Sequence, residues 1–219
     1  MNSKKKRLLQ LLNKGSIYAI TSPRKDVDYI TQVKAALSGN VDIVQFRDKN
    51  LNDKDFEKIA GQLKVLLDKK NVPFIINDRI EIAVRIHAEG FHIGDNEYEF
   101  DYAKKIAQKY DLVLGISSHS INEAIIKERF ADYLGFGPIF DTPNKKNHAL
   151  LGTEKITKLK KAIKKPFVAI GGIDEENLND VLNAGARNVA FIRALCGSED
   201  IKKGTEILKN MLKQFLNKK

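Results

Sequence analysis

Five apolar segments of this 219-residue chain each end in a small cluster of polar residues. The clusters lie at residues 45–49, 77–79, 117–120, 137–146 and 171–173, and they hold carboxylates, amides, hydroxyls, cations and paired glycines. A buried core does not suit such a mixture, because buried polar groups need partners. The mixture suits a phosphorylated ligand that is held together with a divalent metal ion.

The first cluster carries two cations and an amide. Gln45, Arg47 and Lys49 alternate with a period of two, so their side chains share one face if the strand continues that far. Arginine grips two phosphate oxygens at once, and lysine adds a mobile point charge. These residues therefore indicate a pyrophosphate ligand. The alternative is a surface strand end with an Arg–Asp pair.

The second cluster indicates a metal site. Asp78 follows the apolar segment PFII and would bind a hard cation, with Asn77 beside it as a phosphate hydrogen-bond donor. A helix N-cap is the competing explanation, because a helical pattern begins directly afterwards. Further along, Asp95 and Glu97 offer a second carboxylate to the same metal. His92 lies within the intervening strand, where we expect a hydrogen-bonded core residue.

The third cluster contains hydroxyls and an imidazole. We expect Ser117 to form hydrogen bonds at the site and Ser120 to cap the helical pattern that follows. His119 is a candidate general acid or base. The chain has no nucleophile elbow of the GxSxG type, and neighbouring Ser and His residues rarely reach one another as a working dyad.

Two further groups of residues point to phosphate. The segment 137–152 is long for a strand-to-helix connection and is typical of a lid or binding loop, with polar residues at Thr142, Asn144, Lys145 and Lys146. The pair Gly171–Gly172 follows the last of the five apolar segments, and glycine lets the backbone approach a phosphate closely. One more predicted strand, the eighth, ends near Ile192 and Arg193.

Parallel strands are the elements that would bring these clusters together. The sequence predicts eight short strands separated by helical patterns, near residues 16–20, 41–46, 72–76, 90–93, 112–116, 132–136, 166–170 and 188–192. Their apolar character shows little alternation, which favours strands covered on both faces. We therefore predict a single (β/α)8 TIM-barrel domain over residues 1–219, with residues 1–15 as an extra N-terminal helix. An open doubly wound sheet is the alternative, although its GxGxxG and Walker signatures are missing.

Composition limits the classes of function. The formal net charge is +10, but residues 1–25 and 202–219 carry the excess, so the basic ends are solvated helix faces rather than a nucleic-acid or membrane surface. No apolar run approaches the roughly 20 residues of a membrane helix, and no secretory signal is evident. We expect a cytoplasmic protein. The lone Cys196 excludes an intrachain disulfide, and we assign it no catalytic role.

Together, the motifs QFRDK, NDR, GFHIGD, GISSHS, ADYLGFGPIF, TPNKK and AIGGI resemble thiamine-phosphate synthase in order and spacing, from about Tyr18 to Leu195. The resemblance implies a (β/α)8 barrel that joins hydroxymethylpyrimidine diphosphate to thiazole phosphate with Mg²⁺ and releases pyrophosphate. It also implies a dissociative substitution, in which the diphosphate leaves before the thiazole nitrogen attacks. Most of the catalysis would then come from charge neutralisation and positioning.

The resemblance carries site roles onto this chain. Diphosphate ligands would be Arg47, Lys49, Asn77 and Lys145, while Gln45 and Ser117 would contact the pyrimidine and the leaving group. The catalytic residues would be Arg47, Lys49, Ser117 and Lys145. Mg²⁺ ligands would be Asp78 and Glu97, and Thr142 and Gly172 match positions near the thiazole phosphate. We also expect His119, Asn144, Ile192 and Arg193 to bind substrate. The partners implied are the two phosphorylated small molecules, with no nucleic acid and no membrane; a homo-oligomer is compatible with the sequence.

Three positions depart from the family pattern. The second metal carboxylate is Glu97 where the family usually has an aspartate, although Asp95 lies close enough to substitute. Asn144 replaces a threonine of the sixth loop. Arg193 replaces the usual serine at the end of the last strand, where an arginine would either tighten a phosphate site or block it.

Two other functions fit part of the pattern. In the thiazole tautomerase branch of the same family, a histidine after the fifth strand moves a proton and no diphosphate leaves, and His119 fits that role. A non-catalytic barrel that binds a phosphorylated ligand, or regulates through its basic ends, is the other alternative. The retained residues 47–49 and 77–78 favour the synthase.

Overall fold

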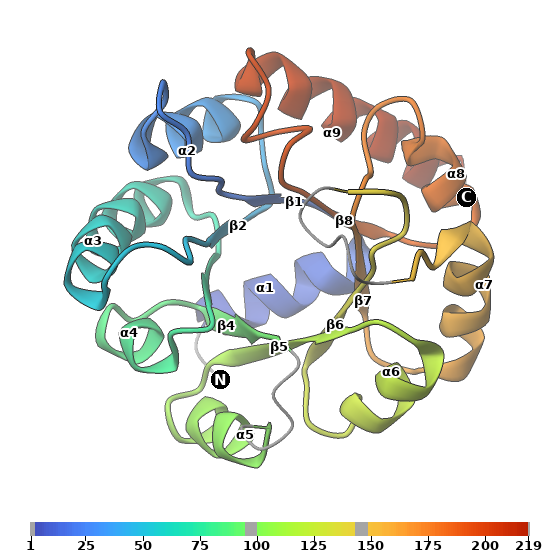
Figure 1. Cartoon of the computed structure of the whole chain (residues 1–219), viewed down its shortest axis with the longest axis horizontal. Helices are drawn as coiled ribbons and strands as arrows, with labels where there is room; N and C mark the ends of the chain where they lie inside the picture. Colours follow the sequence, from blue (N-terminus) through green and yellow to red (C-terminus); the bar gives the residue numbers. More distant parts are fainter. Residues whose placement is uncertain (1–2, 95–99, 143–148, 219) are drawn as a thin grey trace.

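The structure is a computed structural model that describes residues 3–94, 100–142 and 149–218. In these ranges the strands form a closed parallel barrel in the order β1 to β8, with helices packed around it (Figure 1). The strands are β1 (Ser16–Ile20), β2 (Ile43–Phe46), β3 (Phe74–Asn77), β4 (Gly90–Ile93), β5 (Val113–Ser118), β6 (Tyr133–Phe136), β7 (Phe167–Ile170) and β8 (Asn188–Phe191).

The helices follow the strands in alternation, preceded by α1. They are α1 (Ser3–Lys14), α2 (Tyr29–Ser38), α3 (Asp53–Lys70), α4 (Ile80–Arg85), α5 (Phe100–Lys109), α6 (Ile121–Lys127), α7 (Gly152–Ala162), α8 (Leu178–Asn183) and α9 (Ile201–Asn217). β1 pairs with both β2 and β8, so the sheet closes on itself. The barrel prediction and the N-terminal helix are therefore confirmed, and the open-sheet alternative is wrong.

Two apolar cores explain why the strands show little alternation. Ile17 and Ala19 of β1 face the outer helices and belong to the larger core, whereas Tyr18 and Ile20 face the barrel interior. Each strand is thus covered on both faces, by helices outside and by other strands inside. A polar residue on such a strand must find a buried partner or lie at the end of the barrel.

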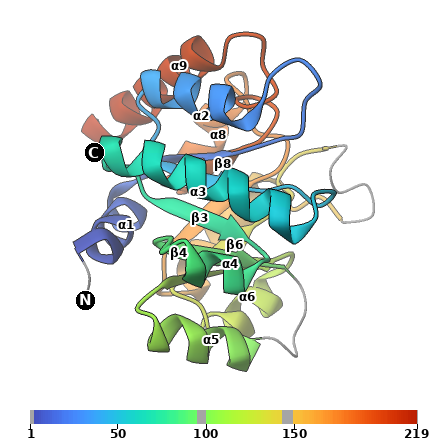
Figure 2. The ribbon, with the colours of Figure 1, turned by 90° about the vertical axis from the view of Figure 1, so that its left-hand side faces the viewer.

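Helix α1 closes the end of the barrel where the strands begin (Figure 2). Leu8 and Leu12 are fully buried and belong to the inner core together with the strand residues. Asn188 donates to the Leu12 carbonyl at 2.7 Å and accepts from the Ser16 hydroxyl at 2.8 Å, which fixes the end of α1 to β1 and β8. With this end of the barrel interior filled by α1, the open end formed by the described residues is the one where the strands end.

The remaining expectations from composition concern Cys196 and membrane helices. Cys196 is buried, and burial raises the pKa of its thiol to about 12, so the thiol stays protonated and fits the structural role expected of it. Within the described ranges, none of the helices is at once long and apolar enough to span a bilayer.

Candidate active site

The predicted site residues meet around a cavity at the carboxyl ends of the strands. The cavity holds about 120 Å³, and its lining includes seven residues expected from the sequence: Gln45, Arg47, Asn77, Ser117, His119, Thr142 and Ile192. A second hollow of about 260 Å³ includes Gly172 and Arg193. Thr142, Gly171 and Ile192 line both, so the two spaces adjoin.

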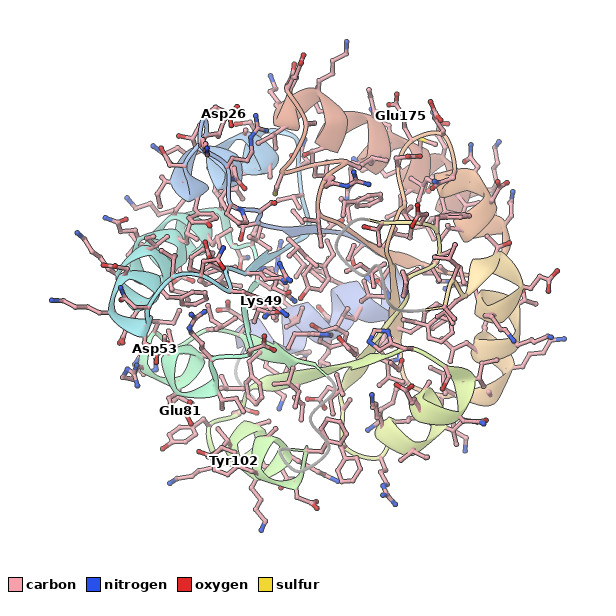
Figure 3. All side chains as sticks on the ribbon, viewed as in Figure 1. Asp26, Lys49, Asp53, Glu81, Tyr102 and Glu175 are labelled. Atoms are coloured by element: carbon pink, nitrogen blue, oxygen red, sulfur yellow. The ribbon has the colours of Figure 1, made fainter. Side chains whose placement is uncertain are left out.

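The segment after β2 turns sooner than the period-two pattern predicts. β2 ends at Phe46, and the Asp48 carboxylate accepts from the backbone N–H groups of Asn50 and Leu51 at 2.6 and 3.0 Å. Gln45 and Arg47 line the cavity as expected, but Lys49 is exposed at its rim and does not line it. In Figure 3, Lys49 lies toward the centre of the barrel, whereas Asp53 lies toward the outer helices.

Asp48 is therefore a structural residue of the loop that carries the two cations. Its carboxylate is buried and also accepts a hydrogen bond from the Tyr29 hydroxyl. Burial raises the pKa of this carboxyl, but the hydrogen bonds from Tyr29, Asn50 and Leu51 and the nearby charge of Arg79 outweigh burial, so the pKa lies below its ordinary value. Asp48 is consequently ionised at neutral pH.

Arg79 holds the same loop from the other side. Its guanidinium donates to the carbonyls of Asp48 and Leu51 and to the Asp53 carboxylate, and it lies 4.1 Å from the centre of the Phe56 ring. The sequence placed Arg79 in a polar cluster but assigned it no role. The geometry shows that β3 positions the Arg47–Lys49 loop through this side chain.

Asp78 stands at the end of β3 with an exposed carboxylate and a φ of 60°. Its Oδ2 accepts from Asn77 Nδ2 at 2.6 Å. The N-cap of α4 is Arg79, which makes no side-chain cap bond, and neither Asn77 nor Asp78 caps the helix. The capping alternative is therefore wrong. A left-handed aspartate is an uncommon, strained conformation that is often found at functional sites.

The structure holds no described cluster of three or more metal-binding side chains. Asp78 is described, but the expected second carboxylate, Glu97, and its neighbour Asp95 lie outside the described residues. Asn144, Lys145 and Lys146 of the sixth loop also lie outside them. These predicted ligands therefore stay predictions.

A chain of hydrogen bonds crosses the floor of the cavity. Gln45 Nε2 donates to the Tyr18 hydroxyl at 2.9 Å, and the hydroxyls of Tyr18 and Tyr133 are 3.0 Å apart. The Tyr133 hydroxyl lies 3.1 Å from His92 Nδ1, and His92 Nε2 lies 3.0 Å from Ser117 Oγ. His92 is hydrogen-bonded, as expected, but it also lines the cavity.

His119 lines the upper wall of the cavity beside Ser117. Its Nδ1 bonds to the Gly137 carbonyl, and its backbone N–H donates to Glu123 at 3.1 Å. A neutral His119 with a proton on Nδ1 presents Nε2 as an acceptor. Ser120 caps α6 by accepting from the Glu123 N–H at 3.1 Å, so that prediction is confirmed.

The paired glycines allow two loops to pack together. Gly171 and Gly172 have φ values of 100° and 67°, and a Cβ at Gly172 would lie 2.5 Å from the Asp141 carbonyl oxygen. Phe140 N–H donates to the Gly171 carbonyl at 2.9 Å, which lays the segment after β6 over the end of β7. The positive φ and this close approach both require glycine.

Backbone N–H groups around the second hollow are available to an anion. Among the described residues, the N–H groups of Gly172, Arg193 and Ala194 donate to no protein acceptor. The Arg193 side chain is exposed and forms no ion pair with a described carboxylate. Arg47 and Lys49, on the other side of the mouth, likewise have no described acidic partner. The mouth of the barrel thus offers donors and cations on two sides of a less charged cavity.

Comparison with known proteins identifies the family. A family model described as thiamine monophosphate synthase matches residues 17–195. The chain belongs to this family.

Relatives match over almost the whole chain. A thiamine-phosphate synthase of Persephonella marina is 36% identical over 203 residues, which cover 91% of this chain and 97% of the relative. One of Clostridium tetani is 40% identical and covers 80% of this chain and 84% of the relative. The solved structure of a thiamine phosphate pyrophosphorylase from Pyrococcus furiosus superimposes with a TM-score of 0.87 at 34% identity, covering 94% of this chain and 99% of that one.

Sequence reasoning missed the residues that support the family's expected ligands. The sequence assigned no role to Tyr18, Tyr133 or Arg79, and it indicated only a hydrogen-bonded core residue at His92. Their roles depend on contacts between β1, β3, β4 and β6, which no local pattern records. One signal was present: a tyrosine or histidine within an apolar strand needs a polar partner once buried.

Proposed function

We propose that this chain couples hydroxymethylpyrimidine diphosphate to thiazole phosphate and releases pyrophosphate, as a thiamine-phosphate synthase. One observation carries the proposal: the barrel mouth has Arg47 and Lys49 on one side, a largely apolar cavity with a few polar groups in the middle, and the Gly172–Arg193 hollow on the other. A substrate pair that contains a diphosphate, an aromatic ring and a monophosphate requires these three parts together. Family membership supports the same assignment and makes the chain a transferase of thiamine biosynthesis.

The chain's own residues act mainly on the leaving group. Arg47 and Lys49 would neutralise the charge that develops on the diphosphate as the C–O bond to the pyrimidine methylene breaks, with Asn77 donating a hydrogen bond. Lys145 stays a proposed ligand of the same group. Gln45 and Ser117 would hold the pyrimidine ring still, so that the resulting methyl cation faces the thiazole nitrogen that captures it.

The second hollow would position the thiazole partner. Its phosphate would accept hydrogen bonds from the N–H groups of Gly172, Arg193 and Ala194, with Thr142 and Ile192 beside it. The Arg193 side chain adds a cation to this side. We propose that it tightens the phosphate site rather than blocks it, because the hollow remains open beside it.

The proposed cofactor is Mg²⁺, and the described residues fit it. The exposed Asp78 carboxylate at the end of β3 is a hard oxygen ligand, and one or two carboxylates with substrate phosphates suffice for this ion. Glu97 or Asp95 would supply the second carboxylate. When bound, Mg²⁺ would neutralise charge on the leaving diphosphate.

The experiment is product formation by the purified protein, followed by mass detection of thiamine phosphate. We expect product only when both substrates and Mg²⁺ are present, and loss of product in EDTA. Arg47→Ala should lower turnover by 100-fold or more, whereas Arg187→Ala, an exposed arginine at the opposite end of β8, should not change it. Full activity in EDTA would refute the metal assignment, and unchanged turnover of Arg47→Ala would refute the diphosphate site.

The tautomerase alternative has one observation in its favour, the place of His119 in the cavity wall. A thiazole tautomerase assay on the same sample separates the two functions, since His119→Gln should abolish tautomerisation but only weaken coupling. If both assays fail, the non-catalytic barrel remains. We further propose a cytoplasmic enzyme with small-molecule partners and no nucleic-acid partner, with the oligomeric state left to measurement.

A further inference from the structure

The hydrogen-bond chain under the cavity links two residues that line it from different strands. It runs from Gln45 of β2 through Tyr18, Tyr133 and His92 to Ser117 of β5, and its four steps measure 2.9, 3.0, 3.1 and 3.0 Å. Tyr133 contacts both of the other middle members, Tyr18 and His92. A Cβ at Gly115 would lie 2.3 Å from Tyr133 Cζ and 2.4 Å from His92 Nδ1, so glycine makes room for both rings.

Such a chain has a direction when the imidazole is neutral. Each hydroxyl donates one hydrogen bond, and a neutral imidazole donates from one nitrogen and accepts at the other. Burial raises the pKa values of Tyr18 and Tyr133 far above the ordinary range, so both stay protonated. In the ordering that starts with Gln45 Nε2 donating to Tyr18, the Tyr18 hydroxyl donates to Tyr133, Tyr133 donates to His92 Nδ1, and His92 Nε2–H donates to Ser117; the last three distances fit either direction.

The direction decides what each end presents to a ligand. With this ordering, Gln45 Oε1 faces the cavity as an acceptor, and the Ser117 hydroxyl hydrogen is left to donate to the ligand. Reversing the chain turns the Gln45 amide over and makes Ser117 donate to His92 instead. The hydrogen-bonding roles of Gln45 and Ser117 therefore change together. A ligand that needs Gln45 as a donor cannot also have Ser117 as a donor.

We propose that this chain of hydrogen bonds determines substrate specificity. It selects a ring that bears an amino group over the same ring that bears an oxo group. The proposal rests on the proposed function, and Tyr18, Tyr133 and His92 are positioning residues in it. An amino group donates to Gln45 Oε1, while a ring nitrogen or a diphosphate oxygen accepts from Ser117. An oxo group forces the reversed ordering, which leaves that second acceptor unpaired.

The first test compares two substrates in three proteins. The probes are hydroxymethylpyrimidine diphosphate, whose ring carries a 4-amino group, and its 4-oxo analogue, each with thiazole phosphate and Mg²⁺. The readout is the ratio of their kcat/KM values. Tyr133→Phe removes the middle hydroxyl. The hydrogen bond between Gln45 and Tyr18 can then reverse its direction without a change at Ser117. We expect the amino-to-oxo ratio to fall at least tenfold relative to the wild type, with Tyr18→Phe as a second variant if Tyr133→Phe does not fold.

Ser16→Ala is the matched control, because it removes a buried hydroxyl bond at the other end of the barrel. It should lower stability without changing the ratio. A ratio in Tyr133→Phe within twofold of the wild type would overturn the inference, as would an equal fall in Ser16→Ala.

The second test does not depend on turnover. ¹⁵N chemical shifts of the imidazole, assigned with His92→Gln, report which nitrogen carries the proton in the free protein. We expect the Nε2–H tautomer in the wild type and a mixture in Tyr133→Phe. An Nδ1–H tautomer or an imidazolium in the wild type would overturn the ordering even if no product forms. Absence of product with a confirmed Nε2–H tautomer would count against the proposed function alone.

Discussion

Removing the Arg79 side chain should damage both the loop after β2 and the activity that depends on it. In Arg79→Ala, the carbonyls of Asp48 and Leu51 lose a charged donor, and Phe56 loses a cation over its ring. Each charged hydrogen bond is worth roughly 1.5–3 kcal/mol, and the ring contact about 0.5–1 kcal/mol. The bond to Asp53 adds little because that carboxylate is 79% exposed.

Water can reach part of the vacated space, since the Arg79 side chain is 20% exposed. We therefore expect a net loss of about 2–4 kcal/mol in the free energy of unfolding, below the roughly 5–15 kcal/mol of a typical domain. The protein should still fold. Arg47 and Lys49 would lose their fixed position, and kcat/KM for the diphosphate substrate should fall about 10- to 100-fold.

Denaturant unfolding and steady-state kinetics measure the two effects. Arg85→Ala is the matched control, because Arg85 sits on α4 and bonds Glu57 with two nitrogens at 2.8 and 2.7 Å on an exposed surface. It should change stability by less than about 1 kcal/mol and leave kcat/KM unchanged. Arg79→Lys should recover only part of the loss, since an ammonium cannot span three acceptors in one plane. An Arg79→Ala protein with wild-type stability and turnover would refute the reasoning.

Three further predictions test other parts of the molecule. Gly172→Ala should raise KM for thiazole phosphate at least tenfold, because the backbone has a φ of 67° and the Asp141 oxygen lies 2.5 Å from the new Cβ. As a control, Gly61→Ala on α3, which has open space around it, should stabilise the protein by about 0.5–1 kcal/mol. Equal KM values in the two variants would contradict the assignment. Leu12→Ala should lower the free energy of unfolding by about 2–5 kcal/mol, measured by heat or denaturant, because this buried side chain fills the end of the barrel. A loss under about 1 kcal/mol would mean that α1 does not close the barrel. Because the pKa of Asp48 is lowered in the folded state, its carboxylate stabilises the protein at pH values above the ordinary carboxyl pKa of about 4, and this stabilisation is lost as the pH falls through the lowered pKa. The stability difference between the wild type and Asp48→Asn should therefore shrink in that acid range. A stability difference that does not change with pH there would contradict this prediction.

The strands were predictable because they depend on local pattern. Apolar segments of four to six residues, separated by helical periods, specify covered parallel strands, and the structure places them within about two residues of the predicted bounds. The same pattern also fits an open doubly wound sheet, whose strands are likewise covered on both faces, and the pairing of β1 with β8 decides for closure. The positions of Gln45, Arg47, Asn77 and Ser117 were predictable for a related reason: all parallel strands end at the same side of a sheet.

The support beneath those residues was decided by tertiary contacts. No sequence pattern shows that Tyr18 and Tyr133 meet inside the barrel or that His92 joins Tyr133 to Ser117, because the partners are 25 to 115 residues apart. The same holds for Arg79, whose acceptors lie on another loop. The early end of β2, which moves Lys49 to the rim, depends on the hydrogen bonds of the buried Asp48.

The sequence by itself determined which groups stand at the mouth of the barrel, because strand direction and side-chain alternation are local properties of the chain. The tertiary structure decided how those groups are oriented and which of them face the cavity. The physical reason is that a buried donor or acceptor must be paired, and the partner is chosen by the packing of the closed barrel rather than by neighbours in the chain.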